Sequence, residues 1–568
     1  MKQSIIAQAP IRNEIQVKMP GGKAYNGPIG TTVEEFIKVA QPETNGKIVA
    51  ALLDNRLREL SVSLNRDVEL EPITMADSDG VRIYRRSLSF LMIAAAAELF
   101  PSELITVHHS MPFGGYYCAL NGGEPLKSKD LNLLKSRMRE LVEENLPIKK
   151  VKIPLDEALE LFRKSGDQEK AELFAKRRKD NLTLYELNGV RDYFHGFMVP
   201  STGYLDLFDL HLYASGFIMQ FPRRHEPDKL QPFEDESRLA RVFREYDSWL
   251  SIIGVPSVSA LNRAIADERT QEVILVAETL HTRQLTEIAS EIAGLWPNVR
   301  VVLISGPSSA GKTTFSKRLA IQLVVLGIKP VAINMDNYFV NREDTPLDED
   351  GELDFESIRA LDVQLFLKQI RSLLAGEVIQ QPKFNFLTGQ SERGRQLSIG
   401  DEHLLLVEGI HGLNPKLVEG VPRELLYRIF VSAFTQLNLD KHNRVPTTDT
   451  RMLRRIVRDA SRRGYSAVET IRRWPSVRRG EKNHIFPHQN NADVFFNSAL
   501  VYELSVLKPL AQPLLLQVEP RTRERIEANR LLAFLQWFQP IVSEGIPNDS
   551  ILREFIGGSI LENFQMWR

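Results

Sequence analysis

Residues 306–313 combine two glycines, a lysine and a threonine in the spacing Gly-x-x-x-x-Gly-Lys-Thr. The glycines let the backbone curl so that successive N–H groups converge on phosphate oxygens. An apolar run, Val301 to Ile304, precedes the motif and a helix-like segment follows it, which favours a phosphate-binding loop over a chance glycine-rich turn. We therefore expect a nucleoside triphosphate with Mg²⁺, bound by Gly306, Ser308, Ser309, Ala310, Gly311, Lys312, Thr313 and Thr314.

Two of these side chains have specific expected roles. The Lys312 ammonium would reach the β- and γ-phosphates, and the Thr313 hydroxyl would bind Mg²⁺. A loop of this kind fits both phosphoryl transfer and plain hydrolysis, so the groups that follow it along the chain must distinguish the two.

Acidic residues follow two further apolar runs. Asp336 comes directly after Val331 to Met335, and Glu408 comes after Leu404 to Val407. Ligands of open α/β sheets bind at the carboxyl ends of the strands. Asp336 could accept the proton of an attacking hydroxyl, and Glu408 could position Mg²⁺ together with Thr313. The alternatives are a turn-forming aspartate and a surface glutamate.

Arginines are concentrated in a third segment, and several of them share one helical face. Like charges at this spacing repel one another unless anions neutralise them, and arginine binds phosphate bidentately. We interpret the segment as a lid that closes over phosphates and substrate. A solvated basic helix paired with acids elsewhere, or an RNA-facing surface, are the alternatives. The arginines are Arg451, Arg454, Arg455, Arg458, Arg462 and Arg463.

Length and composition set the broad class. A chain of 568 residues is too long for one core, so several domains are expected. The formal net charge of −1 gives no global attraction to nucleic acid or membranes, and the single cysteine, Cys118, suits a reducing compartment. The first ten residues lack an apolar block, and Phe90 to Ala97 is too short to cross a bilayer. We expect a cytoplasmic protein and leave its oligomeric state open.

Periodicity divides the chain into five segments. Alternating and helical patterns predict a small β-grasp unit with Thr32 as a helix N-cap, an α+β unit with helices over 87–99 and 131–144, and a helical linker. Apolar strands that alternate with helices then predict a parallel α/β sheet, followed by a helical end. The boundaries are 12–75, 80–225, 226–298, 299–515 and 516–568.

The segment 299–510 resembles the uridine kinase and phosphoribulokinase branch of P-loop kinases. The resemblance includes the loop, Asp336–Tyr338, Pro382–Phe386, Val407–Gly409 and Arg454–Asp459, in the family's order. It implies that Asp336 is the base at a nucleoside 5′-hydroxyl, that Lys312 and Arg458 assist the transfer, and that Thr313 and Glu408 form the Mg²⁺ site. It places Asp348 at the ribose hydroxyls. The full set of substrate-binding residues that it implies is Asp336, Tyr338, Asp348, Phe384, Phe386, Arg455, Arg458 and Arg463.

Three positions depart from that family. Phe384 stands where uridine–cytidine kinases carry a tyrosine, and Gly389 falls where they carry a histidine. Those polar side chains read the pyrimidine edge, and losing them weakens discrimination between bases. Tyr465 replaces a lid arginine. The resemblance therefore implies a kinase more firmly than it implies uridine.

The first half resembles the start of a threonyl-tRNA synthetase. Residues 12–75 resemble its TGS domain, and 80–225 resemble the second additional domain, which edits mischarged tRNA and is shared with alanyl-tRNA synthetases; Glu144–Pro147, Glu157–Phe162 and Val199–Gly203 carry the second match. The ligand-type positions of that editing site fall here on Arg86, Phe90, Phe194 and Met198. These residues are poor zinc ligands, so we expect a non-catalytic binding or packing role.

Two hypotheses follow. The first is a Mg²⁺-dependent nucleoside kinase that transfers the γ-phosphoryl group of ATP to the 5′-hydroxyl of a uridine-like nucleoside. The second is a regulatory NTPase associated with RNA or ribosomes, which the RNA-linked N-terminal resemblance favours. Stimulation of ATP turnover by a nucleoside, or by tRNA or ribosomes, would distinguish them.

Overall fold

A computed structural model describes residues 12–121, 126–177, 179–235, 237–349, 351–435 and 437–564. Residues 1–11, on which the expectation about a leader rests, lie outside this part. The chain forms two compact units. Unit 1 contains Met1–Asp235, Asn438–Arg444 and Glu519–Arg530; unit 2 contains Glu236–Leu437, Val445–Val518 and Leu531–Arg568. Two short segments of the second half of the chain therefore fold with unit 1.

Unit 1 begins with the expected β-grasp. Its sheet has the order β2-β1-β5-β3-β4, with β1 parallel to β5. The Thr32 hydroxyl accepts a hydrogen bond from the Glu35 N–H and the Glu35 carboxylate accepts one from the Thr32 N–H, so the predicted N-cap is confirmed as a capping box. The elements are β1 (Glu14–Lys18), β2 (Ala24–Pro28), α1 (Val33–Ala40), β3 (Ile48–Leu53), β4 (Arg56–Arg58) and β5 (Val68–Thr74).

The rest of unit 1 has two antiparallel sheets, with orders β10-β9-β8 and β11-β12-β7-β6. The long helix α2 begins nine residues before the predicted start at 87, and its middle, from Leu88 to Ala96, is buried. The elements are α2 (Ser78–Leu99), β6 (Leu104–Met111), β7 (Gly115–Asn121), α3 (Ser128–Glu143), β8 (Lys149–Pro154), α4 (Leu155–Lys164), α5 (Gln168–Ala175), β9 (Asn181–Leu187), β10 (Val190–Asp192), β11 (Asp209–Tyr213) and β12 (Gly216–Gln220).

Unit 2 contains the predicted parallel sheet. Its order is β14-β17-β13-β18-β19, and each neighbouring pair is parallel. The central strand is buried along its whole length because helices cover both faces, which explains its unbroken apolar sequence. The strands are β13 (Val301–Ser305), β14 (Lys329–Asn334), β17 (His403–Glu408), β18 (Leu426–Ser432) and β19 (Val494–Asn497).

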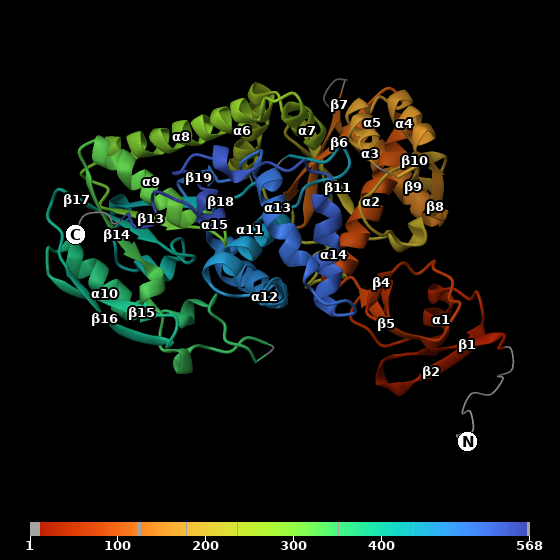
Figure 1. Cartoon of the computed structure of the whole chain (residues 1–568), viewed down its shortest axis with the longest axis horizontal. Helices are drawn as coiled ribbons and strands as arrows, with labels where there is room; N and C mark the ends of the chain where they lie inside the picture. The colour runs from red at the N-terminus through yellow and green to blue at the C-terminus, as the bar shows by residue number, and fades with distance from the viewer. Residues whose placement is uncertain are drawn as a thin grey trace, which may run out of the picture. The chain divides into compact units, whose positions relative to one another are not determined.

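Helices and one hairpin complete unit 2 (Figure 1). The hairpin of β15 (Ile379–Asn385) and β16 (Gln390–Leu397) packs beside α10 (Val363–Leu374). The other helices are α6 (Ser237–Ile253), α7 (Val258–Ala266), α8 (Thr270–Leu295), α9 (Lys312–Val325), α11 (Thr447–Arg462), α12 (Ala467–Gly480), α13 (Glu503–Leu516) and α15 (Arg553–Ile556), and α14 (Arg523–Leu535) begins in unit 1. Among the described helices, none has the length and apolarity that a bilayer crossing requires.

The helices predicted as a linker over 226–298 belong to unit 2. Helix α8 lies along α9, where Arg318 Nη2 donates to Thr282 Oγ1 over 2.9 Å (Figure 1). The polar sequence before α6 suggested a spacer, but the apolar face of α8 packs on the helix that follows the phosphate loop.

Candidate active site

The loop between β13 and α9 has the backbone that its glycines predict. Gly306 has a φ of 153°, and a Cβ there would lie 2.0 Å from the Val431 carbonyl oxygen. Gly311 has a φ of 87° and is the N-cap of α9. Ser309 also has a positive φ, 58°, which costs energy for a residue with a side chain. The loop thus has the curled shape in which backbone N–H groups bind an anion.

Two arginines of α11 donate hydrogen bonds to backbone carbonyls of this loop. Arg451 Nε donates to the Ser308 carbonyl over 3.1 Å, and Arg454 Nη1 donates to the Ser309 carbonyl over 3.4 Å. Both side chains are almost completely buried; Arg451 pairs with Glu481 and Arg454 with Glu503. Burial lowers the pKa of Arg451 to about 10. The expectation that the whole arginine face forms a lid does not hold for these two, which support the loop.

The two predicted carboxylates lie beside the loop. Thr313 Oγ1 donates to Glu408 Oε2 over 3.5 Å. Burial raises the pKa of Glu408 to about 7, opposed by Lys312 and reinforced by Asp336. Burial also raises the pKa of Asp336, and Lys312 is the strongest opposing charge. The charge of Lys312 therefore acts on both Asp336 and Glu408.

The three predicted lid arginines share one counter-ion. Arg455 Nε donates to Asp459 Oδ2 over 3.2 Å, Arg458 Nη2 donates to Asp459 Oδ1 over 2.8 Å, and Arg463 Nε lies 3.7 Å from the same oxygen. Burial raises the pKa of Asp336, and the positive charges of Arg458 and Arg463 oppose this rise. The two arginines therefore act electrostatically on the expected base. Arg455 Nη1 donates to the Ser308 hydroxyl over 2.9 Å. The arginine set of the candidate site is thus centred on Asp459.

Glu356 is a further acid in the site that no sequence motif indicated. Burial raises its pKa to about 7, opposed by Arg455 and Lys312 and reinforced by Glu481 and Asp336. Its Oε2 atom is buried and has no hydrogen-bond partner among the described residues. Buried polar atoms without a partner are uncommon, so this oxygen is available to a ligand group. Glu356 lies in an irregular turn whose sequence gives no signal of function.

Comparison with known proteins assigns this part of the chain. Residues 301–505 match the Phosphoribulokinase / Uridine kinase family. The loop, the two acids and the arginine segment lie within this matched region, which is a P-loop kinase domain. A family of this kind implies ATP as the phosphoryl donor.

Two solved structures that are named as kinases are similar to part of this chain. A putative fructose transport system kinase from Silicibacter sp. TM1040 is 18% identical and covers 37% of this chain and 98% of its own, with a TM-score of 0.28. A possible uridine kinase from Bacillus stearothermophilus is 17% identical and covers 38% of this chain and 98% of its own, with a TM-score of 0.27.

The N-terminal region is similar to threonine–tRNA ligases. The protein from Burkholderia lata is 31% identical over 206 residues, or 36% of this chain and 32% of the ligase. The protein from Francisella tularensis subsp. novicida is 27% identical over 203 residues, with the same coverage. This chain thus spans about a third of the length of these relatives.

The structure gives defined surroundings to four further residues that the kinase resemblance implied. Tyr338 is buried in the core, where its hydroxyl donates to Gln369 Oε1 over 2.8 Å. Phe384 is also buried, whereas Phe386 is 59% exposed, and their ring centroids lie 5.1 Å apart. Asp348 Oδ2 accepts hydrogen bonds from Arg479 Nη2 and the Ser476 hydroxyl, both over 2.8 Å. The structure thus ties Asp348 to α12 by an ion pair.

The donor set beside the kinase loop fits Mg²⁺. A hydroxyl and a carboxylate, from Thr313 and Glu408, supply the hard oxygen ligands that this ion prefers, and Mg²⁺ usually keeps several waters. Lys312 Nζ donates to the Pro307 carbonyl over 3.1 Å, so its ammonium remains within the loop.

In unit 1, the four ligand-type positions of the editing resemblance carry packing residues. The rings of Phe90 and Phe194 lie 5.1 Å apart, and Met198 is buried beside them in the same core cluster. Arg86 Nη1 donates to the Phe197 carbonyl over 2.6 Å. Phe90, Phe194 and Met198 thus form part of an aromatic and aliphatic core and are not metal ligands by type.

Two aspartates and a histidine in unit 1 lie close enough together to resemble a metal site. Ligand atoms of Asp167, Asp440 and His442 lie within 4.8 Å of one another. The ammonium of Lys170 lies 3.3 Å from Asp167, 3.6 Å from Asp440 and 3.3 Å from His442 Nδ1, and it pairs with Asp192 over 2.6 Å. A cation already occupies the centre of this group, so the residues do not fit a divalent ion.

Proposed function

We propose that the kinase domain transfers the γ-phosphoryl group of ATP to the 5′-hydroxyl of a nucleoside, in the manner of a uridine kinase. One observation supports this most: β14 and β17 end level, so Asp336 and Glu408 leave the sheet at the same edge as the phosphate loop, and Lys312 opposes the rise in pKa that burial causes in both acids. A hydrolase needs no carboxylate poised to accept a proton from an alcohol, whereas a kinase does.

Several residues of the chain would have separate roles in the phosphoryl transfer. Asp336 accepts the proton of the attacking hydroxyl. Lys312 and the loop N–H groups hold the β- and γ-phosphates, while Arg458 neutralises charge on the transferring group. Bound Mg²⁺ would supply further neutralisation of phosphate charge from its Thr313 and Glu408 ligands.

We propose that the Glu356 carboxylate binds the sugar hydroxyls of the acceptor. Its free buried oxygen lies within the electrostatic reach of Asp336, whereas both Asp348 oxygens are engaged, one by Arg479 and Ser476 and the other by the Glu352 N–H. A carboxylate that accepts two hydroxyl hydrogen bonds would orient the ribose with its 5′-oxygen toward the base. The exposed Phe386 offers an apolar face for the nucleobase, which gives weak discrimination among bases.

A substrate screen tests the proposal. Purified full-length protein, ATP and Mg²⁺ are mixed with single nucleosides or sugar phosphates, and ADP and phosphorylated products are quantified by chromatography. We expect a nucleoside to raise ADP formation at least about tenfold above the rate without acceptor and to yield its 5′-monophosphate. The Lys312→Met variant should abolish both signals. If no hydroxyl compound is phosphorylated by the wild-type protein, the proposal is wrong.

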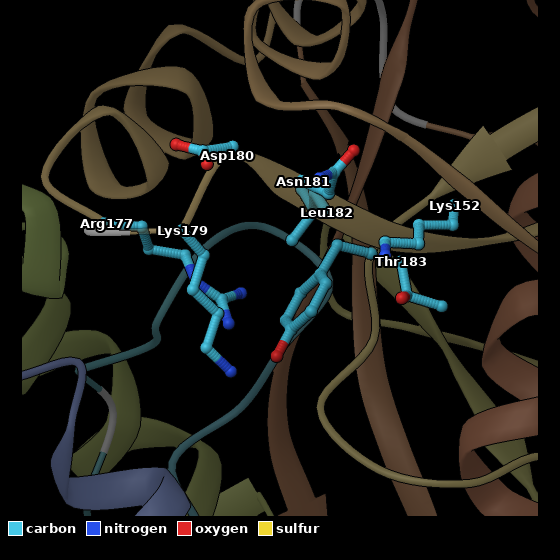
Figure 2. Close-up of a pocket in the computed structure, with 8 residues that line it drawn as sticks. Lys152, Arg177, Lys179, Asp180, Asn181, Leu182 and Thr183 are labelled. Atoms are coloured by element: carbon cyan, nitrogen blue, oxygen red, sulfur yellow. The ribbon is translucent and has the colours of Figure 1, made fainter.

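A regulatory NTPase that contacts RNA is the second candidate, and one pocket in unit 1 favours it. The pocket has a volume of about 560 Å³ and is lined by three cations, Lys152, Arg177 and Lys179, against one acid, Asp180. Figure 2 shows Arg177 and Lys179 extending into the same space while Asp180 points away from it. Such a lining attracts phosphate groups.

RNA binding through this pocket would depend on salt. The double variant Lys152→Gln, Lys179→Gln should then weaken tRNA binding, and tRNA should stimulate ATP hydrolysis by the wild-type protein. If a nucleoside stimulates turnover and tRNA does not, the kinase function is retained and the regulatory NTPase is excluded.

A further inference from the structure

The C-terminal segment places a carboxylate on the phosphate loop. Glu554 Oε2 accepts a hydrogen bond from the backbone N–H of Thr314 over 3.0 Å. Thr314 is the third residue of α9, so its N–H is one of the first-turn donors that no carbonyl of the helix can reach. These are the donors that bind phosphate at a helix N-terminus. Glu554 therefore occupies a group that a bound nucleotide would use.

The segment around Glu554 is firmly built into unit 2. Ile551 and Phe555 are completely buried, and the Arg454 guanidinium lies 4.9 Å from the centroid of the Phe555 ring. A Cβ at Gly311 would lie 2.5 Å from Ile551 Cγ2, so this glycine is needed for the segment's close approach to the loop as well as for the loop's own turn. The segment follows residues 301–505, so it lies outside the part that matches the kinase family.

A second acid on the loop behaves differently. Glu481 Oε1 accepts the Ser308 N–H over 3.2 Å, but Glu481 is completely buried and is also bound by Arg451 and Arg478. These two guanidiniums fix its position. Glu554 is half-buried and has no ion-pair partner within 4.0 Å among the described residues. Its carboxylate is held mainly by the Thr314 N–H and the positive end of α9, so it can be displaced.

We propose that Glu554 competes with the nucleotide for the phosphate loop, so that the C-terminal segment sets the affinity for ATP. A carboxylate and a phosphate oxygen cannot share one N–H, and their like charges repel at that distance. Nucleotide binding must therefore move Glu554 off Thr314. This inference rests on the proposed function only in assuming that a nucleotide binds at this loop.

Binding measurements on Glu554→Gln and Glu554→Ala test the inference without turnover. The dissociation constant for ATP is measured by calorimetry on full-length protein, with and without Mg²⁺. The glutamine keeps the shape of the side chain and removes the charge that competes. We expect both variants to bind ATP about five- to tenfold more tightly than the wild type, as suits the loss of one charge-assisted hydrogen bond to a competitor. The exposed Glu544→Gln removes the same charge elsewhere in this region and should bind like the wild type.

The outcomes separate the inference from the proposed function. If the variants bind ATP as the wild type does, or more weakly, Glu554 is only a cap of α9 and the inference is wrong, while the kinase proposal stands. If the wild-type protein binds no nucleotide, both fail. If Glu554→Ala does not fold, Glu554→Gln alone decides.

Discussion

Asn334 lies opposite Glu408 in the parallel pairing of β14 and β17. Because the two strands end level with each other, Asp336, two residues further on, emerges at the same edge as Glu408 and the loop that follows β13. The Asn334 side chain also accepts the Asp336 N–H over 2.8 Å, which fixes the turn that carries the acid. Strand register thus places the expected base and the expected metal ligand together.

Replacing Asp336 by asparagine tests its role as the base. The amide keeps the shape but cannot accept the hydroxyl proton, so kcat should fall by about a hundredfold or more, while the affinity for ATP changes little. Steady-state kinetics with the best acceptor from the screen, together with ATP binding by calorimetry, would measure both. Near-normal turnover would remove Asp336 from the mechanism.

Glu356 and Asp348 make opposite predictions about the acceptor. If Glu356 binds the sugar hydroxyls, Glu356→Gln should raise KM for the acceptor by about tenfold, with KM for ATP unchanged, because one charge-assisted hydrogen bond is weakened. Asp348→Asn should leave the acceptor KM near its wild-type value, since Asp348 pairs with Arg479. The reverse pattern would show that Asp348 binds the ribose hydroxyls, as the resemblance implied.

The buried arginines predict a large difference in stability within one helix. Arg454→Met leaves Glu503 buried without its partner, which typically costs about 3–5 kcal/mol of the free energy of unfolding. The control Arg462→Met removes a half-exposed pair with Glu562 and should cost less than about 1 kcal/mol. Urea unfolding of both variants would measure the difference. Equal losses would show that Arg454 is not a buried support of the loop.

Local patterns were sufficient for much of this structure. The capping box at Thr32 is specified within four residues, and the apolar run of β13 with the loop behind it within about a dozen. Such signals depend on neighbours in sequence, so the fold class, the loop and the acids at the carboxyl ends of β14 and β17 could be predicted.

Features that depend on long-range packing could not be predicted. Arg451 and Arg458 share one basic helix, and only the structure shows that the first supports the loop while the second faces Asp459. The pKa of Glu356 is raised because the fold buries its carboxyl group. Asn443 has no motif at all, yet its Nδ2 donates to the Tyr193 carbonyl over 3.0 Å, because the segment Asn438–Arg444 folds with unit 1.

The pKa of Glu356 also predicts how stability depends on pH. Burial raises this pKa from 4.5 to about 7 in the folded protein. Between these values the folded protein holds a proton that the unfolded chain has released, so the free energy of unfolding falls as pH rises through the window. Calorimetry of nucleotide-free protein should therefore give a lower Tm at about pH 8 than at about pH 5.5, and Glu356→Gln should reduce this difference because the amide cannot ionise. Glu562→Gln, at an exposed carboxylate, should keep the wild-type difference. An unchanged difference in Glu356→Gln would mean that Glu356 is ionised throughout this range in the folded protein.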